Sequence, residues 1–116
     1  MDQLISHQPG ISACFPAYND GGTIASIVIT ALLTLRKLTD DFEIIVCNDG
    51  SMDFTPEVLN ELAERYPELR VIHHTQNCGY GSALRSAFAQ ATKALIFYTD
   101  GVDVLYTVGN SILTTT

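Results

Sequence analysis

The sequence is poor in basic residues. Six Lys and Arg stand against 13 Asp and Glu, so the formal net charge is −7. Proteins that bind nucleic acid or a polyanionic membrane surface usually carry a basic stripe, and both kinds of partner are therefore disfavoured. A ligand that bears phosphate remains compatible with this charge if a metal ion or the N-termini of helices supply the positive charge.

Cysteine is also scarce. The three cysteines, Cys14, Cys47 and Cys78, are odd in number and form no C-x-x-C pair, which argues against a structural zinc site and a disulfide framework. Cys14 and Cys47 lie in apolar runs, so we expect ordinary buried thiols. A reducing cytosol is the simplest compartment for such a chain.

Long apolar runs are missing as well. The longest, Ile24 to Leu35, is shorter than the about 20 residues that a membrane span needs. The polar segment Met1 to Gly10 does not have the pattern of a signal peptide. The chain has 116 residues, of which 47% are hydrophobic, and this suffices for the core of one small domain, residues 1–116.

Short apolar runs alternate with helical patterns. We expect strands at 11–15, 42–47, 69–74 and 94–98, and helices at 23–38, 55–66 and 82–92. The order β-α-β-α-β-α-β predicts an α/β fold, a three-layer, Rossmann-like parallel sheet with helices on both faces. The segment Val102 to Thr116 has no clear period, so the fourth strand is expected to leave an open edge.

The helical patterns also predict which side chains are buried. Ile27 and Leu38 fall on the apolar stripe of the first helix, and Phe54 is expected to face inward with the apolar side chains of the second.

Polar, turn-forming segments follow each predicted strand and contain Asp20, Asp49 and Asp100. Because the carboxyl ends of parallel strands meet at one edge of a sheet, these carboxylates should converge there. They could accept hydrogen bonds from a base and a ribose, or anchor a hard cation beside a diphosphate. The alternative is that Asp49 and Asp53 only cap the next helix or hold a turn.

Three other features have two interpretations each. Gly79 and Gly81 precede a helix and could cradle phosphate, or could allow close packing of helix on sheet. His73 and His74 should point to opposite faces of the third strand, with a metal or catalytic role for either being the minor alternative. Tyr18 could stack on a base or close the edge of the core.

Four segments, in this order, resemble motifs of the family-2 glycosyltransferases. Phe15–Asp20 is similar to P-x-Y-N-[ED], and Ile45–Asp53 to V-x-[ND]-D-G-S-x-D. Gln76–Arg85 is similar to N-x-G-x-G-x-A-L-R, and Phe97–Gly101 to the start of the D-x-D metal motif. The residues of these motifs are most similar to those of the polyprenyl-phosphate sugar transferases. The resemblance covers residues 10–101 and implies the nucleotide-binding half of an A-type glycosyltransferase domain, followed by a divergent tail, 102–116.

The resemblance also implies roles for individual residues. Pro16, Tyr18 and Asp20 would line a nucleoside pocket. Asp49 would bind the base, uracil or guanine, with Ser51 nearby. The partner would then be a UDP- or GDP-linked sugar, transferred to an acceptor.

The phosphate side of the pocket follows from the later motifs. Gly79, Gly81 and Arg85 would border the ribose and phosphates, and Asp100 would contact the ribose or a divalent Mg²⁺ or Mn²⁺ ion. The family places a second acid directly after Asp100-Gly101, but here Asp103 comes one residue late, a displacement of about 3.5 Å along the chain.

Several alternatives stay open. No residue is assigned as the general base, and the acceptor-binding half lies outside the matched segments. A nucleotidyltransferase would have a basic, glycine-rich loop after the first strand, whereas the segment Asn19-Asp20-Gly21-Gly22 contains no Lys or Arg. The third hypothesis, beside a glycosyltransferase and a nucleotidyltransferase, is a truncated or degenerate, non-catalytic module that binds nucleotide or only self-associates. We expect a homo-oligomer through the last strand and the tail Val102 to Ile112, and a cytoplasmic location that includes the cytoplasmic face of a membrane.

Overall fold

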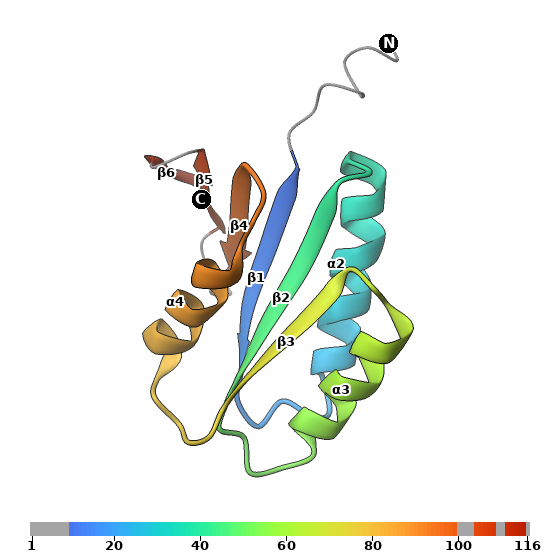
Figure 1. Ribbon diagram of the computed structural model, residues 1–116, viewed down its shortest axis with the longest axis vertical. Coiled ribbons are helices and arrows are strands. Elements are labelled where there is room, and N and C mark those ends of the chain that lie inside the picture. The colour runs from blue at the N-terminus through green and yellow to red at the C-terminus, as the bar shows by residue number, and fades with distance from the viewer. Residues whose placement is uncertain (1–9, 100–103, 109–110, 116) are drawn as a thin grey trace.

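The computed structural model describes residues 10–99, 104–108 and 111–115. They form one six-stranded sheet in the order β3-β2-β1-β4-β5-β6 (Figure 1). Neighbours among β1 to β4 are parallel, whereas β5 and β6 are added antiparallel. The bounds are β1 Ile11–Ala17, α2 Ile24–Leu38, β2 Phe42–Asp49, α3 Thr55–Arg65, β3 Leu69–His74, α4 Tyr80–Gln90, β4 Leu95–Thr99, β5 Val104–Val108 and β6 Ser111–Thr115.

The helices lie on both faces of the sheet. Figure 1 shows α2 and α3 on one face and α4 on the other, which makes the predicted three-layer α/β arrangement. The carboxyl ends of β1, β2 and β3 point toward the same edge, at the bottom of this view. The loops that lead from these strands into α2, α3 and α4 therefore gather there, as the sequence predicted.

Successive residues of the central strands pack against opposite helix layers. Phe15, Ile44 and Val46 join the core under α2 and α3, while Cys14 and Ile45 join the core under α4. This is the period of two that a strand imposes on its side chains. The predicted burial of the Cys14 and Cys47 thiols is confirmed, and burial raises the pKa of Cys14 to about 12 and that of Cys47 to about 11.

Glu43 is a charged side chain that is buried near the amino end of β2, opposite the carboxyl ends of the strands. The Glu43 carboxylate accepts hydrogen bonds from the Ser12 hydroxyl at 2.7 Å, from the Thr92 backbone N–H at 2.7 Å and from the Arg70 guanidinium at 2.7 Å. Burial alone would raise the pKa of Glu43, but these contacts outweigh it and hold the pKa below its ordinary value.

The expected open edge at the fourth strand is wrong. β4 pairs along its whole length with β5, and β5 pairs with β6. The tail has the sequence signal for this arrangement: residues rich in valine, isoleucine and threonine flank Gly109-Asn110, a pair typical of hairpins. Among the described strands, β3 and β6 are the edges.

The predicted burial of three apolar side chains is also wrong. Ile27, Leu38 and Phe54 are 42%, 52% and 58% exposed, respectively. Phe54 lies just before α3 and packs over Gly21, where a Cβ atom would meet its ring. Ile27 and Leu38 instead line an apolar groove of about 450 Å³, between α2 and the strands β1 and β4.

Candidate functional site

A second cavity, of about 360 Å³, opens at the carboxyl edge of the sheet. The end of β1, the end of β2 and the start of α4 enclose it. Its lining includes five of the predicted site residues, Pro16, Tyr18, Asp20, Asp49 and Gly79. The remaining lining residues are Ala17, Asn77, Tyr80 and Ala83. The structure thus brings two of the three predicted carboxylates to one cleft.

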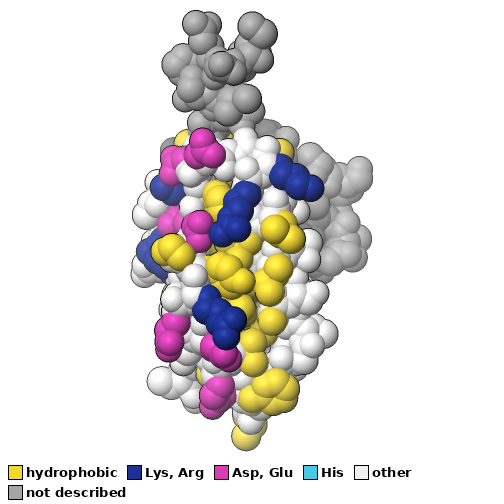
Figure 2. Space-filling model, turned by 90° about the vertical axis from the view of Figure 1, so that its right-hand side faces the viewer, with side chains coloured by type: hydrophobic (Ala, Val, Ile, Leu, Met, Phe, Trp, Pro, Cys, Tyr) yellow, Lys and Arg dark blue, Asp and Glu magenta, His cyan; other side chains and the backbone are white. Residues whose placement is uncertain are grey.

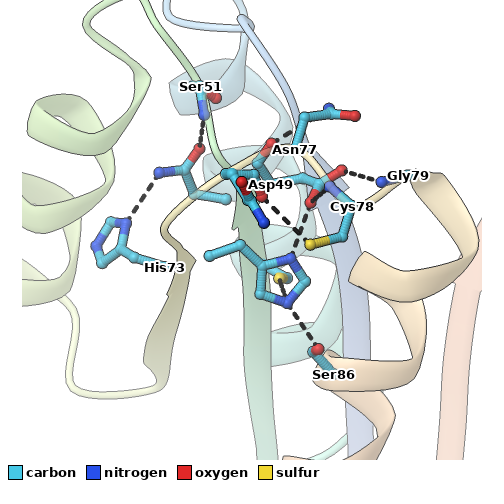
Figure 3. Close-up of polar contacts among 11 residues, drawn as sticks. Asp49, Ser51, His73, Asn77, Cys78, Gly79 and Ser86 are labelled. Atoms are coloured by element: carbon cyan, nitrogen blue, oxygen red, sulfur yellow. Dashed lines mark hydrogen bonds and ion pairs between the residues drawn. The ribbon is translucent and has the colours of Figure 1, made fainter.

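Asp49 is the most enclosed polar group of the cleft, with only 3% of its surface exposed. Its Oδ1 accepts hydrogen bonds from the backbone N–H of Cys78 at 2.9 Å and from Nδ1 of His74 at 2.8 Å. Its Oδ2 accepts one from the backbone N–H of Gly79 at 2.9 Å (Figure 3). Asp49 therefore holds the loop before α4 onto the end of β2.

These contacts set the charge of Asp49. Burial alone would raise its pKa, but the hydrogen bonds from His74, Cys78 and Gly79 outweigh burial and lower the pKa below its ordinary value. Asp49 is consequently an anion at neutral pH, although nearly all of its surface is withdrawn from water.

His74 connects Asp49 to α4. The two residues are paired across β2 and β3, and the ring lies between Asp49 and Ser86. Its Nε2 lies 2.8 Å from the Ser86 hydroxyl and 3.5 Å from Sγ of Cys47. Because an ionised carboxylate can only accept, Nδ1 carries a proton toward Asp49.

Gly50 brings the two segments close together. Its φ of +69° lies in the left-handed region, and a Cβ atom there would overlap the backbone between Gln76 and Asn77. The side-chain amide of Asn77 also donates to the carbonyl of Asp49 at 3.3 Å. Only glycine therefore allows the loop before α4 to lie directly against the end of β2.

The loop after β1 is held differently, by side chains around the start of α3. The backbone N–H of Asn19 donates to the Ser51 hydroxyl at 2.9 Å, and that of Asp20 donates to the Thr55 hydroxyl at 2.8 Å. The backbone N–H of Gly21 donates to Asp53 Oδ2 at 3.0 Å. Ser51 thus contacts the Asn19 backbone and does not line the cleft.

Asp53 has the turn-holding role that was the alternative interpretation. Its Oδ1 accepts the backbone N–H of Thr55 at 2.9 Å, at the first turn of α3. The hydrogen bond from the Thr55 hydroxyl lowers the pKa of Asp53, and the bonds from backbone N–H groups add to this effect.

Gly79 and Gly81, at the start of α4, do not serve close packing of helix on sheet, so that interpretation is wrong. A Cβ atom at Gly79 would meet open space, and the nearest atom to one at Gly81 would be the Arg85 guanidinium at 3.3 Å. Gly79 is needed for its φ of +101°, which lets the chain turn into α4. Gly81 and Arg85 do not line the cleft.

The neighbouring histidines confirm the prediction of opposite faces. His73 lies on the side of α3, where its Nδ1 is 3.0 Å from the Asn48 amide and its Nε2 is 2.9 Å from Asn60 Oδ1. Asn48 Oδ1 accepts the backbone N–H of Ser51 at 3.1 Å, so its amide nitrogen faces His73.

Tyr18 had two interpretations, stacking on a base or closing the edge of the core. Its side chain is 44% exposed and lines the cleft, so the interpretation that it closes the core is wrong.

The predicted metal ligands Asp100 and Asp103 lie outside the described residues. β4 ends at Thr99, the residue before Asp100 in the sequence. Within the described part, Asp49, His74 and Cys78 place one carboxylate oxygen, one ring nitrogen and one sulfur within 4.8 Å of one another.

His74, Ser86 and Asn77 were not identified as site residues from the sequence. The register of β2 and β3 places His74 beside Asp49, and counting back from the two strand ends would have suggested this pairing. No comparable signal exists for Ser86, because its contact depends on how α4 lies across the sheet.

The profile of the family described as Glycosyl transferase family 2 matches residues 12–106. The chain belongs to this family. The match includes all four motif segments and the cleft between them. The fold and the resemblance inferred from the sequence are thereby confirmed, together with the class of glycosyltransferases.

Curated relatives are much longer than this chain. It is 37% identical over 92 residues to the glycosyltransferase AglD of Haloferax volcanii, covering 78% of this chain and 15% of the relative. It is 33% identical over 92 residues to an undecaprenyl-phosphate 4-deoxy-4-formamido-L-arabinose transferase of Photorhabdus laumondii, covering 78% of this chain and 28% of the relative.

Solved structures agree with the fold. The mannosyltransferase PcManGT from Pyrobaculum calidifontis, in complex with GDP-Man and Mn²⁺, superposes with a TM-score of 0.72 at 25% identity. That alignment covers 84% of this chain and 29% of the mannosyltransferase. The structure of S. aureus TarS 1-349 in complex with UDP gives a TM-score of 0.57 at 26% identity, covering 83% and 28%. Among the described helices of this chain, none is long and apolar enough to cross a membrane.

Proposed function

We propose that this chain forms the donor-binding half of a glycosyltransferase that transfers a sugar from a UDP- or GDP-linked donor to an acceptor. The observation that carries the proposal is the cleft of about 360 Å³ at the carboxyl edge of the sheet, with Asp20 and Asp49 in its lining. The cleft lies within the segment that matches the family, and two similar structures hold GDP-Man and UDP.

Within this proposal each predicted residue has a place. Pro16, Tyr18 and Asp20 lie around the nucleoside, and Asp49 accepts a hydrogen bond from the base. Ser51 acts through the backbone of Asn19, which it holds at 2.9 Å.

The phosphate side is assigned on the same basis. Gly79 exposes backbone at the cleft, and Gly81 and Arg85 follow on the first turns of α4. Asp100 and Asp103 would hold Mg²⁺ or Mn²⁺, which offsets the charge of a diphosphate leaving group. A metal ion is needed for this, because the chain itself carries a net charge of −7.

The test is calorimetric titration of the chain with UDP and with GDP, each with and without Mn²⁺ or Mg²⁺. We expect metal-dependent binding that Asp49→Ala and Asp100→Ala both weaken at least tenfold, about 1.4 kcal/mol. Asp40→Ala, at the opposite edge of the sheet, is the matched control and should bind as the wild type does. Absence of binding to either nucleotide in all conditions would contradict the proposal.

A second candidate function is a non-catalytic module that binds nucleotide or self-associates. The apolar groove beside α2 favours it, because exposed hydrophobic side chains follow the length of this face (Figure 2). The fourth strand pairs with β5 and offers no free edge, so we propose a homo-oligomer through the tail alone, where β6 is an edge of the described sheet. Light scattering that shows a monomer at high concentration would contradict this. The proposed location is the cytoplasm, including the cytoplasmic face of a membrane.

A further inference from the structure

The hydrogen-bond capacity of Asp49 is almost filled by the protein itself. A carboxylate offers about four lone-pair positions, two on each oxygen. On Oδ1 both are taken, by Nδ1 of His74 at 2.8 Å and by the Cys78 backbone N–H at 2.9 Å. On Oδ2 one is taken, by the Gly79 backbone N–H at 2.9 Å. No group among the described residues takes the second position on Oδ2, so it remains for a donor in the cleft that Asp49 lines.

Which oxygen stays available depends on His74. The two backbone donors come from adjacent residues of one loop and each contacts a different oxygen, so they restrain the carboxylate plane. The imidazole adds the third bond and comes from the end of β3, which is paired with Asp49 on β2. Without it, Oδ1 would regain a lone pair in a place where only 4% of the Asp49 side chain is exposed.

The other side of the imidazole fixes its own orientation. Nε2 meets the Ser86 hydroxyl at 2.8 Å, and a hydroxyl can either donate or accept. Because Nδ1–H donates to Asp49, Nε2 of the neutral ring accepts from Ser86. The carboxylate on β2 thus selects the tautomer, and the hydroxyl on α4 complements it by donating to Nε2.

We propose that His74 is a positioning residue for nucleotide binding: held by Ser86, it donates from Nδ1 to Asp49 and leaves a single acceptor position on Oδ2 for an N–H group of the base. This inference rests on the proposed function, since it deepens the role of the same cleft. His73 provides an internal contrast. Its Nδ1 faces the Asn48 amide nitrogen and its Nε2 faces Asn60 Oδ1, so it has the opposite tautomer.

The first test is spectroscopic and needs no ligand. The ¹⁵N shifts and couplings of the ring nitrogens at neutral pH should show His74 as the Nδ1–H tautomer and His73 as the Nε2–H tautomer. In Ser86→Ala the Nδ1–H tautomer should persist, because Asp49 still accepts from Nδ1, while the Nε2 signal should shift with the loss of the hydroxyl donor. A His74 ring protonated on Nε2 alone would overturn the proposal.

The second test separates positioning from a general effect on folding. An asparagine amide reproduces the Nδ1–H donor of histidine, a glutamine amide reproduces the Nε2 position, and leucine provides neither. We expect His74→Asn to bind UDP or GDP within about threefold of the wild type, and His74→Gln and His74→Leu to bind at least tenfold more weakly. Amide exchange of Cys78 and Gly79 should rise in the same two variants. His73→Leu is the matched control and should leave nucleotide affinity unchanged.

The outcomes distinguish the two proposals. Wild-type chain that binds neither nucleotide would overturn the proposed function and the base-facing role of Asp49 together, while the tautomer and amide exchange would still decide whether His74 orients the carboxylate. Equal binding by the wild type and all three His74 variants would overturn the positioning role and leave the proposed function intact. Equal losses in all three variants, with normal folding, would also overturn it.

Discussion

Two loops border the cleft, and they are held in opposite ways. The loop after β1 makes four hydrogen bonds to the start of α3 and the segment before it, shared among the side chains of Asn19, Ser51, Asp53 and Thr55. Within the part of the chain that the structure describes, the loop before α4 bonds to Asp49, through the backbone of Cys78 and Gly79 and the amide of Asn77. The first arrangement distributes the stabilisation, and the second concentrates it.

The difference follows from burial. Around Asn19 the contacts are exposed, so that water can replace any one of them at a small cost. Asp49 is buried, and its loss removes at once the acceptor of two backbone N–H groups and of His74. We therefore expect single substitutions to have large effects at the β2–β3 side of the cleft and small effects at the exposed contacts of Asn19.

The largest effect is expected from Gly50→Ala. The new Cβ would overlap the backbone between Gln76 and Asn77, and the residue has a φ of +69°. Left-handed strain of about 1–2 kcal/mol and overpacking of about 1–3 kcal/mol should add, giving about 3 kcal/mol of destabilisation in chemical denaturation. Gly22→Ala, where a Cβ would meet nothing within 4 Å, is the control. A loss below about 1 kcal/mol would contradict the direct contact of the two segments.

Asp49→Ala should have the next largest effect. It removes the acceptor of two backbone N–H groups and of His74, and we expect a loss of about 2–3 kcal/mol in the free energy of unfolding. Hydrogen exchange should show Cys78 and Gly79 as the amides whose protection falls most. Equal protection in the variant and the wild type would show that the loop does not depend on this carboxylate.

Acid should destabilise the domain through Asp49 and Glu43. Hydrogen bonds hold both pKa values below their unfolded values, so both groups stabilise the fold above the unfolded pKa of about 4. That stabilisation is lost as pH falls through the folded pKa. Asp49→Asn should make the decrease of the melting temperature between about pH 5 and 2 shallower. An unchanged slope would assign the acid sensitivity to other groups.

The smallest effect is expected from Asn19→Ala. The change removes one acceptor, Asn19 Oδ1, from the Met52 N–H at 2.8 Å and places alanine at a φ of 53°. We expect about 1 kcal/mol of destabilisation, because three other bonds still hold this loop. Asn19→Gly, which tolerates the backbone conformation, should recover part of it. A loss as large as that of Asp49→Ala would remove the contrast between the two loops.

Much of this protein could be read from its sequence. The alternation of apolar runs and helical patterns was enough for the order of seven elements, because periods of two and 3.6 depend only on local geometry. Ordered motifs at the strand ends were enough for the family and for the edge that holds the cleft. For the tail the sequence pattern led to a wrong prediction, an open edge at the fourth strand. Its lack of a clear period hid the strands β5 and β6, although Gly109-Asn110 is a pair typical of hairpins.

Only the tertiary structure decided which of those polar residues act on each other. Asp49 and His74 are 25 residues apart, and the register of β2 and β3 brings their side chains to 2.8 Å. The Ser86 contact depends in addition on how α4 crosses the sheet. Sequence patterns record which face of an element is apolar, whereas hydrogen bonds between elements require their relative positions to within a few tenths of an ångström. The sequence by itself therefore determined the family and the layers, and packing decided that Asp49 anchors a loop and is oriented by His74.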